Sequence, residues 1–289
     1  MTLVIRTNTP TTDPDARTLV RDALLDGATD GVRFLYDFGH RYGWPSTAAP
    51  VNGSVIPDVS EHGDGAFAIP SGQAVTLGGN GIDFSSLTQQ PTEIQIPASF
   101  AANIWGSANQ YFLIALYLKL PLESEWPTSG KRPFLCFTET NSGYLTPELD
   151  LVTLSMWTSG GNKYLAADRQ TEGGATVSST FFILPSTHFG QVGQFAFWRN
   201  AAGQGLRWID AGGQASAATE VSVNNSGDFS AKVGRIGVPE TLWNLNDAGH
   251  QASSNFKFYR AFGENLATSG RNPTTVLDAD YARNIGKMG

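Results

Sequence analysis

Two carboxylates begin a strand-like stretch of the chain, Glu148 and Asp150 in "TPELDLVTLSMW". Retaining glycosidases use two carboxyls about 5 Å apart, one as nucleophile and one as acid/base. Such a pair on this strand would need a second Glu shortly after Asp150, where Val152 and Thr153 stand instead. Because alternate strand residues share a face, Glu148, Asp150 and Val152 are predicted on one solvated face. We therefore expect no catalytic residues here; a partner acid on another strand is the alternative.

The sequence gives only weak indications of a metal site or of a reactive cysteine. The four histidines are too dispersed for a metal site: His40, His62, His188 and His250. The loops "SEHGDG" and "NNSGDF" offer oxygen atoms, so Ca²⁺ is an alternative to plain turns there, and we otherwise expect no cofactor. Cys136 has no partner for an internal disulfide, and its apolar neighbours predict a buried, inert thiol.

Tryptophans are the better ligand candidates, because an exposed ring can stack on a sugar. Those in loops are favoured, although they could instead anchor a loop or fill an interface. The candidate ligand-binding residues are Trp126, Trp243, Asn244 and Asp247. Three tryptophans that fall within strand patterns are predicted to be core: Trp157, Trp198 and Trp208.

Composition restricts the class of partner. The chain has 289 residues, a formal net charge of −7 and only 16% charged residues, with 32 glycines. The basic residues are scattered, which argues against nucleic-acid binding. No stretch approaches a membrane span and the N-terminus has no apolar signal core, so we expect synthesis in a cytoplasm without a cleaved signal and no membrane insertion.

The first 31 residues differ from the rest. "MTLVIRTNTPTT" is predicted to be an extended arm, followed by an amphipathic helix from Asp13 to Gly27. The arm is expected to attach the protein to its neighbours by adding a strand to a sheet edge, while the helix stripe packs on this domain or on another subunit. The proposed assembly residues are Leu3, Ile5, Leu19, Val20, Ala23 and Leu24.

From Val32 onward, short β runs alternate with turns rich in Gly, Pro, Asn and Asp. The longest apolar run, "NQYFLIALYLKLP", is predicted to be a central strand buried on both faces. A late helix is predicted from Thr275 to Arg283. We expect one all-β, antiparallel jelly-roll β-sandwich over 32–289, preceded by the arm and helix over 1–31.

The order of these pieces resembles the concanavalin A-like, laminin-G-like lectin jelly roll. "FLYDFG", "VIPDVSEHGDGAF" and "GNGIDF" stand where that family has its opening strand, polar turn and next strand. "GQFAFWRNAAGQGLRWIDAGG" is similar to a family hairpin in which Phe195 and Phe197 face Leu206 and Trp208. "AKVGRIGVP" and "NFKFYRAFGENLATSGRNPTTVLDADYA" resemble its closing segments, with Lys257 in place of the usual Gly.

The resemblance implies three alternative functions. The first is a non-catalytic structural protein of a phage particle, in the capsid or the tail, held to other virion proteins by its arm and expected to form a homo-oligomer. The second is a carbohydrate-binding adhesin that recognises surface glycans. The third is a family 16-type glycoside hydrolase. The fold alone does not choose among them.

Overall fold

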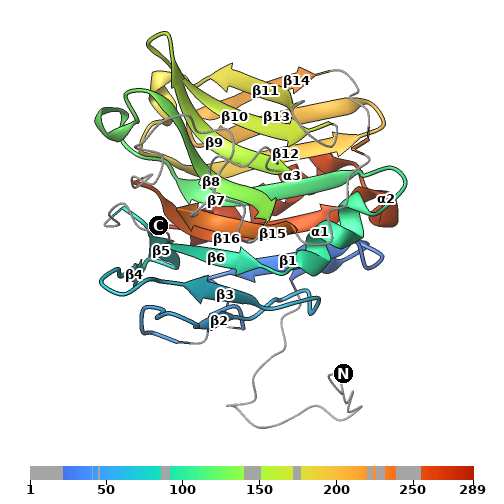
Figure 1. Ribbon diagram of the computed structural model, residues 1–289, viewed down its shortest axis with the longest axis horizontal. Helices are drawn as coiled ribbons and strands as arrows, with labels where there is room; N and C mark the ends of the chain where they lie inside the picture. Colours follow the sequence, from blue (N-terminus) through green and yellow to red (C-terminus); the bar gives the residue numbers. More distant parts are fainter. Residues whose placement is uncertain are drawn as a thin grey trace.

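The computed structural model describes residues 22–40, 42–44, 46–85, 92–139, 151–171, 177–219, 224–225, 232–238 and 255–289. Two antiparallel sheets, A and B, are stacked on each other (Figure 1). Sheet A contains β1 (Val32–Asp37), β4 (Thr76–Gly78), β5 (Gly81–Asp83), β7 (Phe112–Lys119), β12 (Val192–Asn200), β13 (Gly203–Asp210), β14 (Gly213–Thr219) and β16 (Lys257–Asn265). Sheet B contains β2 (Val55–Ile56), β3 (Gly65–Ala68), β6 (Thr92–Ile96), β8 (Gly130–Glu139), β9 (Val152–Ser159), β10 (Asn162–Gln170), β11 (Val177–Ile183) and β15 (Lys232–Val238).

The strand order is β14-β13-β12-β7-β16-β5-β4 in sheet A, with β1 also pairing β16, and β11-β10-β9-β8-β15-β6-β3-β2 in sheet B. Every described pairing is antiparallel, so the predicted all-β antiparallel sandwich is confirmed. The helical elements are η1 (Ala23–Leu25), α1 (Ala98–Trp105), η2 (Glu123–Glu125), η3 (Ser186–His188), α2 (Leu266–Ser269), α3 (Pro273–Asn284) and η4 (Ile285–Lys287). No helix in the described ranges is long and apolar enough to span a membrane.

β7 is the central strand that the sequence predicted. It lies between β12 and β16, and its side chains are buried on both faces. Ile114 and Leu116 face the main core between the sheets. Leu113 and Ala115 face a second apolar cluster on the opposite side, to which Leu277 of α3 also belongs. The outer face of sheet A is therefore covered by helical segments.

Two hairpins of sheet A show how the local sequence sets the turn and the pairing. Gly79 and Asn80 join β4 to β5 with φ angles of +50° and +58°, which a two-residue hairpin turn requires. In the β12–β13 hairpin, the predicted alternation also holds, because Phe195 pairs with Trp208 and Phe197 with Leu206. All four of these side chains are buried.

One facing prediction is wrong. Val152, expected on a solvated face, is fully buried and belongs to the main core with Leu154 and Met156. Thr153 therefore takes the outer face of β9. Glu148 and Asp150 lie outside the described residues.

The predicted late helix is confirmed as α3, one to two residues longer at each end. Asn272 caps its N-terminus by accepting the backbone N–H groups of Thr274 and Thr275, and Pro273 opens the first turn. Of the predicted early helix, the described part is the 3₁₀ turn η1, capped by Asp22, and Gly27 has the left-handed φ of +69° expected after a helix. The helix α1 was not predicted.

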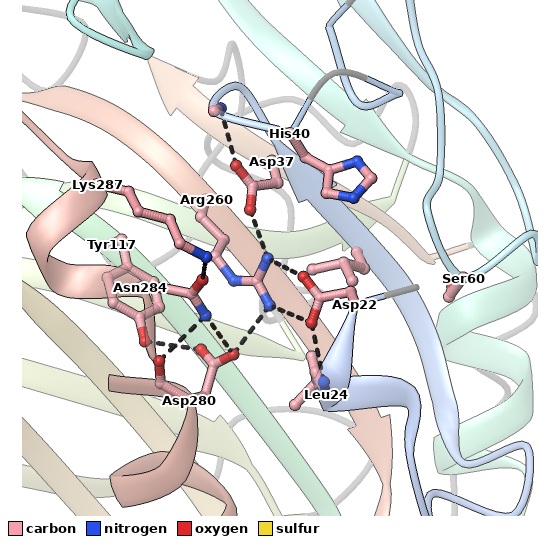
Figure 2. Close-up of polar contacts among 12 residues, drawn as sticks. Asp22, Leu24, Asp37, His40, Ser60, Tyr117, Arg260, Asp280, Asn284 and Lys287 are labelled. Carbon is pink, nitrogen blue, oxygen red and sulfur yellow. Dashed lines mark hydrogen bonds and ion pairs between the residues drawn. The ribbon is translucent and has the colours of Figure 1, made fainter. Parts of the chain in front are cut away.

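A buried arginine joins the covering segments to sheet A. Arg260 of β16 is completely buried and contacts three carboxylates (Figure 2). Its guanidinium nitrogens lie 2.8 Å from Asp22, 2.5 Å from Asp37 and 2.9 Å from Asp280. These acids come from the segment before η1, from the end of β1 and from α3. One cation thus holds together three segments far apart in the sequence.

Further hydrogen bonds complete this Arg260 network. Asp280 accepts the hydroxyl of Tyr117 at 2.7 Å and the side-chain amide of Asn284 at 2.9 Å. Burial would lower the pKa of Arg260, but Asp280, Asp37 and Asp22 outweigh it and raise that pKa. Burial, with the adjacent Asp280, also raises the pKa of Tyr117, so its hydroxyl stays a neutral donor. Because the charges are paired with one another and are buried or nearly so, the network is structural.

Replacing Arg260→Met should destabilise the fold strongly, since it leaves buried carboxylates without their counter-ion. Removing one partner of a buried ionic cluster costs about 3–5 kcal/mol. The matched control is Arg283→Met, an exposed arginine of α3, which should change stability by less than about 0.5 kcal/mol. Urea unfolding of both variants measures this; equal effects would contradict the structural role of Arg260.

Asp22 should make stability pH-dependent. Burial would raise the pKa of Asp22, but the charge and hydrogen bonds of Arg260 and the N–H of Leu24 lower it overall. A carboxyl with a lower pKa in the folded than in the unfolded state stabilises above its unfolded pKa, and that contribution is lost as pH falls through its folded pKa. We expect Asp22→Asn to cost about 1–2 kcal/mol at neutral pH. In urea titrations, the difference from the wild type should shrink on acidification; a constant difference would contradict this assignment.

Candidate binding site

The β9–β10 hairpin builds an aromatic surface on the outer face of sheet B. Gly160 and Gly161 form its turn with φ angles of +56° and +80°, the left-handed conformations that a tight two-residue hairpin favours. This turn fixes the register and places Trp157 directly opposite Tyr164. Because Leu154 and Met156 face the core, Trp157 must face outward.

The neighbouring strand extends this surface. β11 pairs with β10 so that Ile183 lies opposite Tyr164 and Phe181 opposite Ala166. Trp157 and Tyr164 are half-buried, whereas Phe181 and Ile183 are 45% and 57% exposed. We call these four residues, Trp157, Tyr164, Phe181 and Ile183, the β9–β11 surface.

The three aromatic rings hold one another in place. The rings of Trp157 and Tyr164 are 4.8 Å apart between centroids and tilted by 31°. Phe181 stands nearly perpendicular to both, at 5.3 Å from Trp157 and 5.6 Å from Tyr164. Edge-to-face contacts of this kind are favourable beyond their buried area. The surface is thus preorganised, and little side-chain entropy would be lost when a ligand binds.

A charged group borders the aromatic rings. Lys131 of β8 lies opposite Trp157, with its Nζ 5.1 Å from the centre of that ring and 2.5 Å from Asp168. Asp168 also accepts the hydroxyl of Ser179 at 2.5 Å. The outer faces of four adjacent strands, β8 to β11, therefore combine apolar rings with a neutralised ion pair.

This combination suits a ligand with both apolar and hydroxyl-bearing faces. Ring faces and edges of Tyr164 and Phe181 can contact C–H groups, and the exposed Ser179, held by the buried Asp168, can exchange hydrogen bonds with hydroxyls. The ion pair leaves no net charge on the surface, so attraction for a strongly charged ligand would be small. A neutral carbohydrate has this chemistry.

The sequence-predicted ligand residues are not brought together among the described residues. Trp126 is only 4% exposed, and its ring packs at 5.1 Å, edge to face, on Phe189. Its indole N–H donates to the carbonyl of Trp157 at 3.4 Å. Trp126 therefore anchors its loop, which was the alternative reading, and is not an accessible stacking ring. Trp243, Asn244 and Asp247 lie outside the described residues.

Of the predicted assembly residues, the structure describes only Ala23 and Leu24. Leu24 is buried in the second apolar cluster, so it packs within this chain, which was one of the two alternatives for the helix stripe, and a role in assembly stays a prediction. Ala23 lines a cavity of about 330 Å³ between η1 and α3. Leu3, Ile5, Leu19 and Val20 lie outside the described residues, and their role stays a prediction.

No group of three or more potential metal ligands occurs in the described ranges. In the "SEHGDG" region, the carboxylate of Asp58 accepts the N–H groups of Leu35, Ser60, His62 and Gly63. N–H donors directed at both of its oxygens stabilise the loop and leave them poorly placed to bind a cation. Ca²⁺ binding at either loop stays a prediction; of "NNSGDF", only Asn224 and Asn225 lie among the described residues.

Two residue types that often act in catalysis, a histidine and a cysteine, are buried among the described residues. His188 lies 2.8 Å from Asp210 through its Nδ1, and both side chains are buried. Asp210 also accepts the indole N–H of Trp208 at 2.7 Å, so the pair fixes η3 against β13. Cys136 is buried, as predicted.

The sequence did contain one signal for the aromatic surface that was missed. Trp157 was predicted in the core, yet it is half-buried on the outer face. A Gly-Gly turn between two strands indicates a two-residue hairpin, and counting outward from Gly160 and Gly161 pairs Trp157 with Tyr164. By contrast, Trp208 is fully buried as predicted, and Trp198 packs half-buried against the second apolar cluster.

No protein-family model and no curated protein matches this chain. Among solved structures it is similar to a Trypanosoma rangeli sialidase in complex with 2,3-difluorosialic acid, with 14% identity and a TM-score of 0.49, over 82% of this chain and 32% of the sialidase. This chain thus spans about a third of that enzyme. It is also similar to the CBM2 module of the evolved Dit of Lactobacillus casei BL23 phage J-1, with 12% identity and a TM-score of 0.43, over 81% of this chain and 95% of that module.

A third similar structure is tailspike protein 2 of an Escherichia coli O157:H7 bacteriophage, with 14% identity and a TM-score of 0.39, over 68% of this chain and 24% of the tailspike. Similarity at this level does not establish a shared activity, ligand or assembly. The function must therefore be argued from the chemistry of this chain.

Proposed function

We propose that this chain is a non-catalytic, carbohydrate-binding β-sandwich, and that it serves as a structural component of a phage particle. The observation that carries the binding role is the ordered aromatic cluster of the β9–β11 surface beside the Lys131–Asp168 ion pair. The ligand class is a neutral glycan with an apolar sugar face. The place in a virion rests on the sequence resemblance to lectin-like phage proteins.

Exposed aromatic groups on a folded monomer commonly mark a binding surface. Here the rings are held by a rigid sheet and lie beside polar groups that can determine orientation. The surface is open and borders an edge strand, which fits a side-on contact with a polysaccharide chain. A charged ligand is less suited, because Asp168 already neutralises Lys131.

The non-catalytic part of the proposal follows from the carboxylates. Glycoside hydrolysis needs two carboxyls that share a substrate, with one of them protonated. On the outer face of sheet B, Asp168 is paired with Lys131 and Glu93 with Arg235. Both carboxylates are almost completely buried, so neither presents an acid to a substrate that lies on this surface.

A binding measurement tests the proposed site. We expect Tyr164→Ala to weaken binding of a host-surface polysaccharide about tenfold, equivalent to about 1.4 kcal/mol, because it removes the central ring of the surface. Isothermal titration calorimetry on the full chain gives the affinity. The matched control is Tyr42→Ala, a half-buried tyrosine in a distant loop, which should bind like the wild type.

Three results would count against the proposal. Unchanged affinity in Tyr164→Ala would remove the β9–β11 surface as the site. Release of oligosaccharides that disappears in Glu148→Gln would show a hydrolase instead. Absence of the chain from purified phage particles, measured by mass spectrometry, would contradict the virion role, whereas its copy number per particle would separate capsid from tail.

A further inference from the structure

A buried hydroxyl group lies without a hydrogen-bond partner beneath the β9–β11 surface. Ser155 of β9 is completely buried, and its Oγ makes no hydrogen bond with any residue that the structure describes. Because Leu154 and Met156 face the core, Ser155 points outward, toward the same side as Trp157. An unpaired buried hydroxyl is unfavourable and uncommon, so this one requires an explanation.

The residues on either side of Ser155 offer it no polar side chain. Ser155 lies opposite Ala166 of β10 and Pro133 of β8. Neither of these side chains has a hydrogen-bonding atom. Because all three side chains are small, they form a low floor in the outer face of the sheet. Along β10, this floor lies between the larger side chains of Tyr164 and Asp168.

The Lys131 side chain covers this floor. Lys131 lies opposite Trp157, whereas its partner Asp168 lies opposite Thr153, four residues away from Trp157 on β9. The Nζ of Lys131 reaches Asp168 at 2.5 Å, so the lysine stem crosses β9 at the position of Ser155. The Lys131 side chain is itself 13% exposed. It therefore separates the Ser155 hydroxyl from solvent.

This cover can move without disturbing the sheet. A lysine has a flexible four-carbon stem, and its ammonium is a point charge that accepts many arrangements of partners. Asp168 also accepts the hydroxyl of Ser179 at 2.5 Å, so it keeps one donor when Lys131 turns aside. A ligand that displaces the lysine stem therefore meets Ser155 on a floor that the three strands have already formed.

We propose that Ser155 is a specificity-determining residue of the β9–β11 surface, where it hydrogen-bonds a hydroxyl of the bound sugar after Lys131 has turned aside. This inference rests on the proposed function and adds one directional contact to the aromatic rings. A sugar that places a hydroxyl above Ser155 pairs the buried group. A stereoisomer without a hydroxyl at that position leaves Ser155 unpaired and binds more weakly.

Isothermal titration calorimetry with soluble glucose, galactose and mannose polysaccharides, each titrated into the full chain, tests this role. We expect Ser155→Ala to weaken binding of the preferred polysaccharide about fivefold, and so to reduce the differences among the three. The same substitution should leave the melting temperature of the free protein unchanged or higher, because it removes an unpaired buried hydroxyl. A residue with only a structural role would not lower affinity while stability is preserved.

The matched control is Thr92→Val. Thr92 of β6 is also completely buried, with an Oγ1 that has no partner among the described residues, but it lies three strands from β9. This variant should resemble Ser155→Ala in stability and bind like the wild type. Nuclear magnetic resonance follows the cover itself. Because the end of the Lys131 side chain lies over the Trp157 ring, its ε-methylene signal should shift when polysaccharide saturates the protein.

The outcomes separate this inference from the proposed function. If Tyr164→Ala binds weakly but Ser155→Ala binds like the wild type, the surface is the site and Ser155 is not part of it, as when Ser155 holds a trapped water. An unmoved Lys131 signal at saturation likewise overturns the inference. If the wild type binds none of the three polysaccharides, the proposed function and this inference both fail.

Discussion

The ion cluster around Arg260 is the interaction on which the helix-covered face of sheet A depends. One buried guanidinium in β16 contacts carboxylates from the start of the described chain, the end of β1 and the C-terminal helix α3. A buried cation without partners would be strongly unfavourable, and so would the acids alone. Because each group requires the others, β1, η1 and α3 are held at defined positions on sheet A. The apolar cluster beneath α3 then provides the burial that fixes the helix.

This arrangement makes the two outer faces of the sandwich different. Sheet A is covered by η1, α2 and α3, whose apolar side chains pack on Leu113 and Ala115. In sheet B, the outer face of β9 to β11 carries half-buried or exposed aromatic rings instead. The covered face serves stability, and the open end of the other sheet provides the surface proposed for binding. The same rigid strands hold the rings of this surface in place.

Local patterns in the sequence predicted much of the fold. The long apolar run of β7 and the late helix α3 were predicted from local patterns, and both are found, although α3 begins at Pro273 and not at Thr275. α1 was missed because it lacks a side-chain N-cap: Pro97 precedes it, and no side chain caps its first turn. The sequence therefore offered no N-terminal capping signal for α1, although Gly106 follows its last residue.

The candidate site was harder to predict for two reasons. Met156 and Trp157 are adjacent and both apolar, so the sequence pattern does not show which of the two side chains faces the core. In the folded sheet, Leu154 and Met156 face the core and Trp157 faces outward. The partner strand β11 follows a connection whose length does not determine its register, so Phe181 and Ile183 could not be placed beside Tyr164. The Arg260 network is a stronger case, because Asp22 and Arg260 are 238 positions apart and meet only through tertiary structure.

The most direct test of the proposed binding surface is hydrogen–deuterium exchange of the full chain with and without a bound host-surface polysaccharide, at a fixed protein concentration. The structure predicts slower exchange in peptides that cover β9, β10 and β11, with no change in β1, β16 or α3. Protection confined to another part of the chain, or the same exchange with and without the polysaccharide, would contradict the account.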